Sequence, residues 1–132
     1  MTGHETIDRG LGVPEIRSIS AVTLATRDMA RAVRFYGALG FRMAYGGETA
    51  AFTSFRVGRE SLNLARAADR PTSTGLARVI FYVDDVDAMY RHVLAQGLTP
   101  ETAPQDAAWG ERYFHLNDPD GHALSFARPV GS

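Results

Sequence analysis

The residues best suited to bind a small molecule are concentrated between Trp109 and Arg128. This segment has the pattern of two strands joined by Asp118-Pro119-Asp120-Gly121, a tight turn in which Pro presets φ and Gly takes a positive φ. In the expected register, one face collects the large apolar residues Phe114, Leu116, Leu124 and Phe126. The opposite face collects Tyr113, His115, Ala123, Ser125 and Ala127. This mixture of aromatic, polar and small side chains predicts the wall of a cavity, in which the small residues either leave room for a ligand or allow close packing.

A second strand, Arg78 to Val83, places Arg78, Ile80 and Tyr82 on one inward face. The Arg78 guanidinium could bind a carboxylate, phosphate or carbonyl oxygen of a ligand. The alternatives are an ion pair with a neighbouring acid and a head group that reaches solvent. Trp109, in the loop next to Gly110, could stack over a planar ligand, or it could fill the local core.

Of the four histidines, only His115 is expected to face the cavity. It could act as a general base, or it could be a hydrogen-bonded wall residue. His4 belongs to the N-terminal arm, His92 to the polar side of a helix, and His122 to a structural position beside the turn. The sequence has no nucleophile–base–carboxylate set, phosphate-binding glycine loop or dinucleotide fingerprint.

Composition narrows the classes of function. With 132 residues, of which 45% are hydrophobic and 22% charged, the chain is expected to form one soluble globular domain with a core. A net charge of -1 without a basic run argues against nucleic acid or an anionic membrane as the main partner. The absence of cysteine excludes disulfide and thiolate chemistry and is consistent with the cytoplasm. We find no signal peptide and no apolar run of membrane-spanning length.

The elements that position the candidate residues form two similar halves. In the first, Asp28 is placed to cap a helix and Gly40 is placed to end it. The apolar stripe of this helix is Met29, Ala32, Val33 and Tyr36. The strands expected around the helix are 16–26, 41–45, 51–57 and 61–65.

The second half repeats the first. Its helix begins after Asp85 and ends at Gly97, and a weak strand over 99–103 precedes the hairpin. A spacing of 57 residues relates Asp28 to Asp85, Gly40 to Gly97 and Ala21 to Arg78, and a spacing of 62 relates Leu62 to Leu124. We therefore predict an N-terminal arm (1–15), two β-α-β-β-β modules (16–68 and 77–129) and a linker (69–76).

Three motifs resemble the vicinal oxygen chelate superfamily, which includes glyoxalase I, bleomycin-resistance proteins and extradiol dioxygenases. They are Thr26-Arg27-Asp28-Met29 leading into Phe35-Tyr36 and Leu39-Gly40-Phe41, then Val83-Asp84-Asp85-Val86, then Asp118-Pro119-Asp120-Gly121-His122. The resemblance implies an α+β fold of tandem βαβββ modules, with mixed sheets curled around a cavity and helices outside. It also implies a homodimer, swapped or unswapped, in which modules of both chains often build each cavity.

Metalloenzymes of this superfamily hold a divalent metal with His and Glu side chains from four strands. The matching positions here are Ala21, Asn63, Arg78 and Ser125. Ala has no donor atom, Arg repels a cation, and Ser and Asn are weak neutral ligands. We therefore expect neither a metal nor another cofactor. A shifted metal site would have to use His115, His122, Glu111 or Glu60.

The resemblance implies a cytoplasmic protein similar to the bleomycin-resistance branch, which sequesters a drug or metabolite without chemistry. We predict a planar or anionic small-molecule ligand, bound by Arg78, Tyr82, Trp109, Tyr113, His115, Asn63 and Ser125. One alternative is an enzyme, either a metal-dependent lyase or dioxygenase or a metal-free catalyst that uses His115 or Arg78. Another is a regulatory or subunit role with a vestigial cavity.

Overall fold

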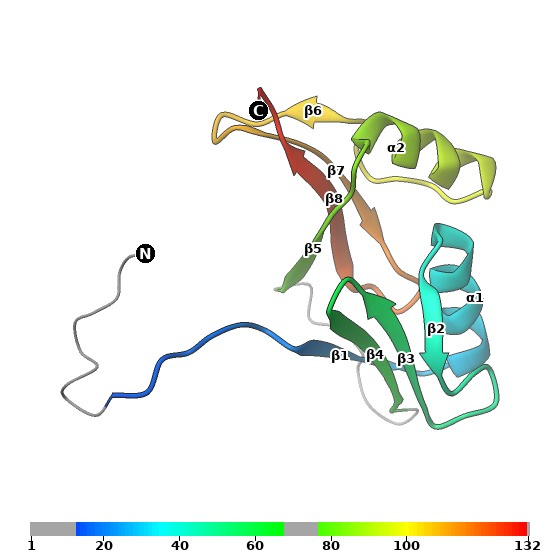
Figure 1. Cartoon of the computed structure of the whole chain (residues 1–132). Coiled ribbons are helices and arrows are strands. Elements are labelled where there is room, and N and C mark those ends of the chain that lie inside the picture. Colours follow the sequence, from blue (N-terminus) through cyan, green and yellow to red (C-terminus); the bar gives the residue numbers. More distant parts are fainter. Residues whose placement is uncertain (1–12, 68–76, 132) are drawn as a thin grey trace.

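The computed structural model describes residues 13–67 and 77–131 and contains two modules of the same topology (Figure 1). The first module comprises β1 (Ala21–Thr26), α1 (Met29–Leu39), β2 (Arg42–Tyr45), β3 (Phe52–Val57) and β4 (Glu60–Arg66). The second comprises β5 (Arg78–Tyr82), α2 (Val86–Ala95), β6 (Gln105–Asp106), β7 (Glu111–Asn117) and β8 (Ala123–Pro129). The two sheets have the strand orders β1-β4-β3-β2 and β5-β8-β7-β6. The predicted α+β fold of tandem βαβββ modules is therefore confirmed.

The internal repeat extends to the register of the strands. In each sheet the first strand pairs in parallel with the last, and the other pairs are antiparallel. Val22 lies opposite Leu62 in the first sheet, and Val79 lies opposite Leu124 in the second. These pairs are related by the same spacings of 57 and 62 residues that the sequence indicates.

Both helices begin where their caps were expected. The Asp28 carboxylate accepts a hydrogen bond from the Arg31 N–H at 3.0 Å, and the Asp85 carboxylate accepts one from the Ala88 N–H at 2.9 Å. Helix α1 ends at Leu39 and is capped by Gly40, whose φ of 108° is the left-handed conformation that glycine adopts without strain. Helix α2 ends at Ala95, two residues before Gly97.

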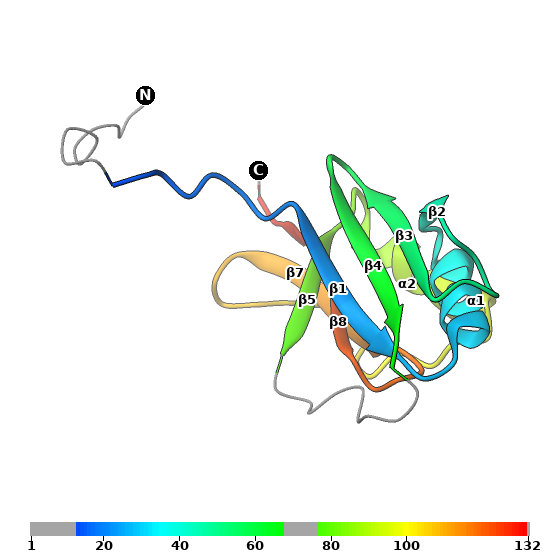
Figure 2. The same cartoon turned by 90° about the horizontal axis from the view of Figure 1, so that it is seen from below.

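Each helix covers one face of its own sheet, and the core lies between the helices and the sheets (Figures 1 and 2). The modules share this core, because the rings of Phe41 and Phe81 lie 5.0 Å apart across their boundary. The buried Tyr36 hydroxyl donates to the Asp118 carboxylate at 2.7 Å, which ties α1 to the turn before β8. In the same turn Asp120 accepts from the Thr26 hydroxyl at 2.6 Å. The sheet faces opposite the helices are left uncovered by the described residues.

Two expected strands differ from the structure. The first begins at Ala21 rather than Ile16, because its partner β4 begins at Glu60 and the preceding residues 13–20 are exposed without a strand partner in the described chain. The strand predicted over 99–103 is wrong, and β6 is only Gln105–Asp106.

The segment 99–103 is not a strand, but it forms hydrogen bonds with β7 at one residue, His115. The Glu101 N–H donates to the His115 carbonyl at 2.8 Å, and the Thr102 hydroxyl accepts from the His115 N–H at 3.0 Å. Pro100 and Pro104 cannot donate to a ladder, so the pairing does not propagate. Residues 1–12 of the predicted arm and the predicted linker lie outside the described residues. None of the described helices is long and apolar enough to cross a membrane.

Candidate functional site

The uncovered face of the second sheet brings most of the predicted site residues together. The cross-strand rows of this sheet are Tyr82–Ala127–Tyr113 and Ile80–Ser125–His115. Arg78 begins β5 next to these rows, and Trp109 lies just before β7 with 71% of its surface exposed. We call this surface, with Arg78, Ile80, Tyr82, Trp109, Tyr113, His115, Ser125 and Ala127, the second-sheet face. Asn63 lies on β4 of the other sheet and is not part of it.

The small residues of β8 form the floor of this face. Ser125 and Ala127 are only 3% and 1% exposed, because side chains from the flanking strands reach over β8. Arg78 reaches His115, and Tyr82 donates its hydroxyl hydrogen bond to Glu111. A ligand on this face would therefore lie on the bridging side chains and not directly against β8.

The Arg78 guanidinium is anchored through one nitrogen. Its Nη1 lies 2.9 Å from the Leu124 carbonyl, 3.0 Å from the Ser125 hydroxyl and 2.9 Å from His115 Nδ1. No carboxylate in the described chain forms an ion pair with Arg78, whereas ion pairs do hold Arg31, Arg34 and Arg112. The guanidinium is thus held in place but its charge is not neutralised by an acid of the described residues.

These contacts fix the protonation of His115. A guanidinium only donates hydrogen bonds, so Nδ1 accepts from Arg78, and the Ser125 hydroxyl lies 2.7 Å from the same nitrogen. Burial lowers the pKa of His115 below its ordinary value of 6.5, and the charge of Arg78 lowers this pKa further, against a smaller opposing effect of Glu101. The imidazole is therefore neutral with its proton on Nε2. Since Nδ1 is engaged, it is not free to serve as a general base.

An aromatic row runs along β7 beside this cluster. The rings of Trp109 and Tyr113 are stacked with centroids 5.8 Å apart, and the Tyr113 and His115 rings are 4.9 Å apart. Glu111 holds the outer end of the row, because it accepts from the Trp109 indole at 3.0 Å and from the Tyr82 hydroxyl. The hydrogen bond to Glu111 raises the pKa of Tyr82. From the sequence, Glu111 is a candidate only for a metal ligand, because its hydrogen bond with Tyr82 depends on β5 lying next to β8.

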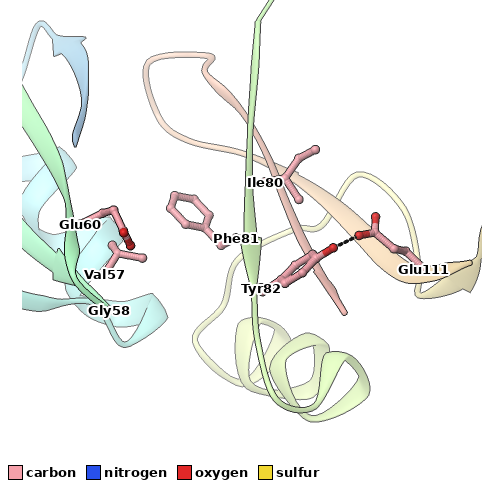
Figure 3. Close-up of a pocket in the computed structure, with 7 residues that line it drawn as sticks. All are labelled: Val57, Gly58, Glu60, Ile80, Phe81, Tyr82 and Glu111. Carbon is pink, nitrogen blue, oxygen red and sulfur yellow. Dashed lines mark hydrogen bonds between the residues drawn. The ribbon is translucent and has the colours of Figure 1, made fainter. Parts of the chain in front are cut away.

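Two hollows adjoin the second-sheet face along β5. One, of about 640 Å³, lies between β1 and β5 and is lined in part by Ala21, Arg78 and Ile80. The other, of about 580 Å³, has Glu60 on one side and Tyr82 with Glu111 on the other (Figure 3). In Figure 3 the ring of Phe81 points from β5 toward the first module, whereas Tyr82 points toward Glu111. The β5 side chains therefore alternate between the core and the second-sheet face.

The four positions that the family resemblance assigns to metal ligands, Ala21, Asn63, Arg78 and Ser125, carry no suitable donor set in this chain. Arg78 and Ser125 bond to each other, and the Asn63 amide donates to the Thr23 hydroxyl at 3.2 Å. In residues 13–67 and 77–131, no group of three or more His, Cys, Asp or Glu side chains is arranged to hold a metal ion. These residues do not fit a divalent metal, which requires convergent, electron-rich ligands.

The alternative metal ligands are also dispersed. The His122 Nε2 donates to the Ala25 carbonyl at 2.7 Å, and Glu111 is engaged by Trp109 and Tyr82. His92 similarly donates to the Ala38 carbonyl at 2.8 Å, at the contact between the two helices. His4 lies outside the described residues. The structure therefore does not assemble His115, His122, Glu111 and Glu60 into a shifted metal site.

Comparison with known proteins identifies the family. A sequence model of the Glyoxalase/Bleomycin resistance protein/Dioxygenase superfamily matches residues 18–126. The chain belongs to this superfamily. Among curated superfamily relatives, an uncharacterized protein of Mycobacterium bovis is 44% identical over 62 residues, which are 46% of this chain and 41% of that protein. A bleomycin resistance protein of Geobacillus stearothermophilus is 33% identical over 76 residues, which are 52% of this chain and 58% of that protein. The chain thus matches less than two thirds of the length of these relatives.

Solved structures share the superfamily fold. A glyoxalase/bleomycin resistance protein/dioxygenase from Nocardioides aligns with a TM-score of 0.71 at 19% identity, over 94% of both chains. TioX from Micromonospora sp. ML1 aligns with a TM-score of 0.68 at 28% identity, over 86% of this chain and 100% of that chain. A bleomycin-binding protein complexed with bleomycin aligns with a TM-score of 0.69 at 23% identity, over 86% of this chain and 98% of that chain. The superfamily contains both binding proteins and enzymes, so the residues of the site must decide the function.

Proposed function

We propose that this superfamily member binds a small organic molecule on the second-sheet face and releases it unchanged. The observation that carries the proposal is the row of Trp109 and Tyr113, which is uncovered in the described chain and lies beside an anchored guanidinium. Stacked aromatic rings offer a large apolar surface with defined orientation, which suits a planar ligand. The names of two relatives, a bleomycin resistance protein and a bleomycin-binding protein, support the binding of a small molecule.

The proposed binding requires no metal and no other cofactor. This part of the proposal rests on the chemistry of the donor set at Ala21, Asn63, Arg78 and Ser125. It also rests on the state of His115, whose Nδ1 is occupied by Arg78 and Ser125. A site built in this way is better suited to hold a ligand, such as a drug or metabolite, than to transform it.

A second copy of the chain would complete the site in this proposal. Large apolar side chains remain exposed on the sheets, including Ile80 at 57%, Tyr82 at 62%, Tyr45 at 66% and Phe52 at 39%. A monomer rarely leaves that much apolar surface uncovered without a partner. We therefore propose a cytoplasmic homodimer that binds its ligand between sheets and has no nucleic-acid or membrane partner.

Calorimetric titration with a panel of planar compounds tests the proposal. We expect saturable binding in the presence of EDTA, and recovery of the unchanged compound by mass spectrometry. Trp109→Leu should weaken binding about tenfold, because the ligand loses a stacking surface. Leu94→Ala is the control, since it removes an exposed apolar side chain from α2, outside the second-sheet face and outside the sheets. Conversion of a compound that depends on an added metal would contradict the proposal.

A further inference from the structure

We infer that Arg78 is the receptor for a carboxylate group on the ligand, and that the ligand's aromatic ring stacks on Tyr113 and Trp109. This inference rests on the proposed function and specifies the chemical class of its ligand as a planar aromatic carboxylate. It follows from the disagreement between this chain and the metal-binding members of its superfamily, because a fixed positive charge stands where a metal ligand would be expected.

The anchoring of Arg78 leaves one edge of its guanidinium available. A guanidinium has five N–H donors, and the two on Nη1 are directed to Leu124, Ser125 and His115. The three remaining donors, on Nε and Nη2, have no hydrogen-bond partner among the described residues. The edge formed by Nε and Nη2 presents two roughly parallel N–H groups, which match the two oxygens of a carboxylate.

The anchor also determines how well Arg78 is preorganised. Ser125 is 3% exposed and lies beneath both Arg78 and His115, so its hydroxyl supports the guanidinium from inside the protein. The Leu124 carbonyl belongs to the central strand β8 and adds a rigid acceptor. A receptor that is held before the ligand arrives loses less conformational freedom on binding.

The charges of the second-sheet face orient such a ligand. His115 carries its proton on Nε2, which has no partner in the described chain and adds a neutral donor near Arg78. The Glu111 carboxylate lies at the opposite end of the aromatic row, where it accepts from Trp109 and Tyr82. An anionic group is attracted to the Arg78 end and repelled from the Glu111 end. The ring therefore lies between these ends, along Tyr113 and Trp109.

The test compares 2-naphthoate with 2-naphthamide, which has the same ring system but no charge, by calorimetric titration of the full chain. We expect 2-naphthoate to bind at least about tenfold more tightly than 2-naphthamide, since hydrogen bonds to an ionised group are the stronger ones. In Arg78→Gln this ratio should fall to about one, whereas the affinity for 2-naphthamide should stay within about twofold. Arg91→Gln is the matched control, because it removes the same charge from α2, which covers the other side of the sheet.

Two further variants separate the receptor from its support. Arg78→Lys keeps the charge but loses the paired donors, so the ratio should take an intermediate value, and this variant also serves if Arg78→Gln does not fold. Ser125→Ala should lower the ratio without abolishing it, since Ser125 is a positioning residue. Circular dichroism checks that each variant is folded.

The outcomes distinguish this inference from the proposed function. If both compounds bind the unaltered chain with equal affinity, or if Arg78→Gln keeps the preference for 2-naphthoate, the carboxylate receptor is wrong and the proposed binding function stands. If neither compound binds at millimolar concentration and no planar compound of the panel binds, both proposals fail.

Discussion

The two sheets have the same strand order and register, yet their uncovered faces have different chemistry. At positions related by the repeat, Ala21 of the first sheet corresponds to Arg78 of the second, and Asn63 corresponds to Ser125. Ser54, which lies opposite Asn63, corresponds to His115, which lies opposite Ser125. The first sheet thus carries only small neutral side chains where the second carries a guanidinium, an imidazole and a hydroxyl in mutual contact. The residues that face the helices and the core determine the fold of both modules, whereas the residues on the uncovered faces of the sheets can differ in chemistry.

The largest expected effects are equal in the two modules. Leu62 and Leu124 occupy matching positions that face the core, and they are 1% and 0% exposed. We expect Leu62→Ala and Leu124→Ala each to lower the free energy of unfolding by about 2–5 kcal/mol, from lost burial and the cavity left behind. Urea unfolding measures both, with Leu94→Ala on the exposed side of α2 as the control. A loss below about 1 kcal/mol in only one module would show that the modules do not contribute equally to the core.

The hydrogen bond between Tyr36 and Asp118, which joins the modules, should have the next largest effect on the free energy of unfolding. Tyr36→Phe removes the hydroxyl that donates to the buried Asp118 carboxylate at 2.7 Å. We expect the free energy of unfolding to fall by about 1.5–3 kcal/mol, because a hydrogen bond to a charged, buried acceptor is lost. Tyr90→Phe is the control, since its hydroxyl has no hydrogen-bond partner in the described chain while its ring packs against Phe114. Equal losses in the two variants would show that the Tyr36 hydroxyl contributes nothing specific.

Substitutions of the polar residues at matched positions of the two sheets should have different effects on the free energy of unfolding. Ser125→Ala removes a buried hydroxyl that contacts both Arg78 and His115, and we expect a loss of about 1 kcal/mol in unfolding free energy. Asn63→Ala removes one exposed hydrogen bond to Thr23 and should change stability by less than about 0.5 kcal/mol. Thermal and urea unfolding of both variants make the comparison. A larger loss in Asn63→Ala than in Ser125→Ala would show that the contacts of Ser125 with Arg78 and His115 do not stabilise the fold more than the contact of Asn63 with Thr23.

The smallest expected effect is a pH dependence that His115 gives to the second sheet. Burial and the Arg78 charge lower the pKa of His115 in the folded chain, so below about 6.5 the unfolded chain binds more protons. The free energy of unfolding should therefore fall as the pH decreases through the range below 6.5. His115→Gln should reduce this slope, whereas His92→Gln, on α2, should retain it. A slope that is unchanged in His115→Gln would mean that other groups cause the pH dependence.

Much of the fold could be predicted because local signals agreed with each other. Asp28, Asp85 and Gly40 occupy the caps expected of them, and the turn at Asp118 fixes the hairpin register that pairs Phe114 with Phe126 and His115 with Ser125. The prediction failed where a strand depended on its partner. Ile16 alternates like a strand residue but precedes the first residue that pairs with β4, and the segment 99–103 contains Pro100 and is followed by Pro104.

The site could be predicted only as a set of residues on one face. The alternation of β5 and β7 places Arg78, Tyr82, Tyr113 and His115 on that face. It does not reveal that Arg78 reaches over β8 to His115, nor that Tyr82 reaches over β8 to Glu111, since both contacts require side chains to cross an intervening strand. Nor could the sequence indicate that Ser125 is covered by its neighbours, because burial on the second-sheet face depends on the lengths of the flanking side chains.

The pairing of first and last strands has a consequence for the kinetics of folding. In both modules the first strand in the chain pairs with the last strand of that module. The β1–β4 and β5–β8 pairs therefore join residues that are far apart in the sequence. Pairing between distant parts of the chain slows folding, because the entropy cost of closing a long loop comes before the favourable strand contacts form. The hairpins β3–β4 and β7–β8 are local and can form early. We expect each module to fold by capture of its first strand onto a preformed hairpin, with β1 and β5 the last strands to gain protection from hydrogen exchange.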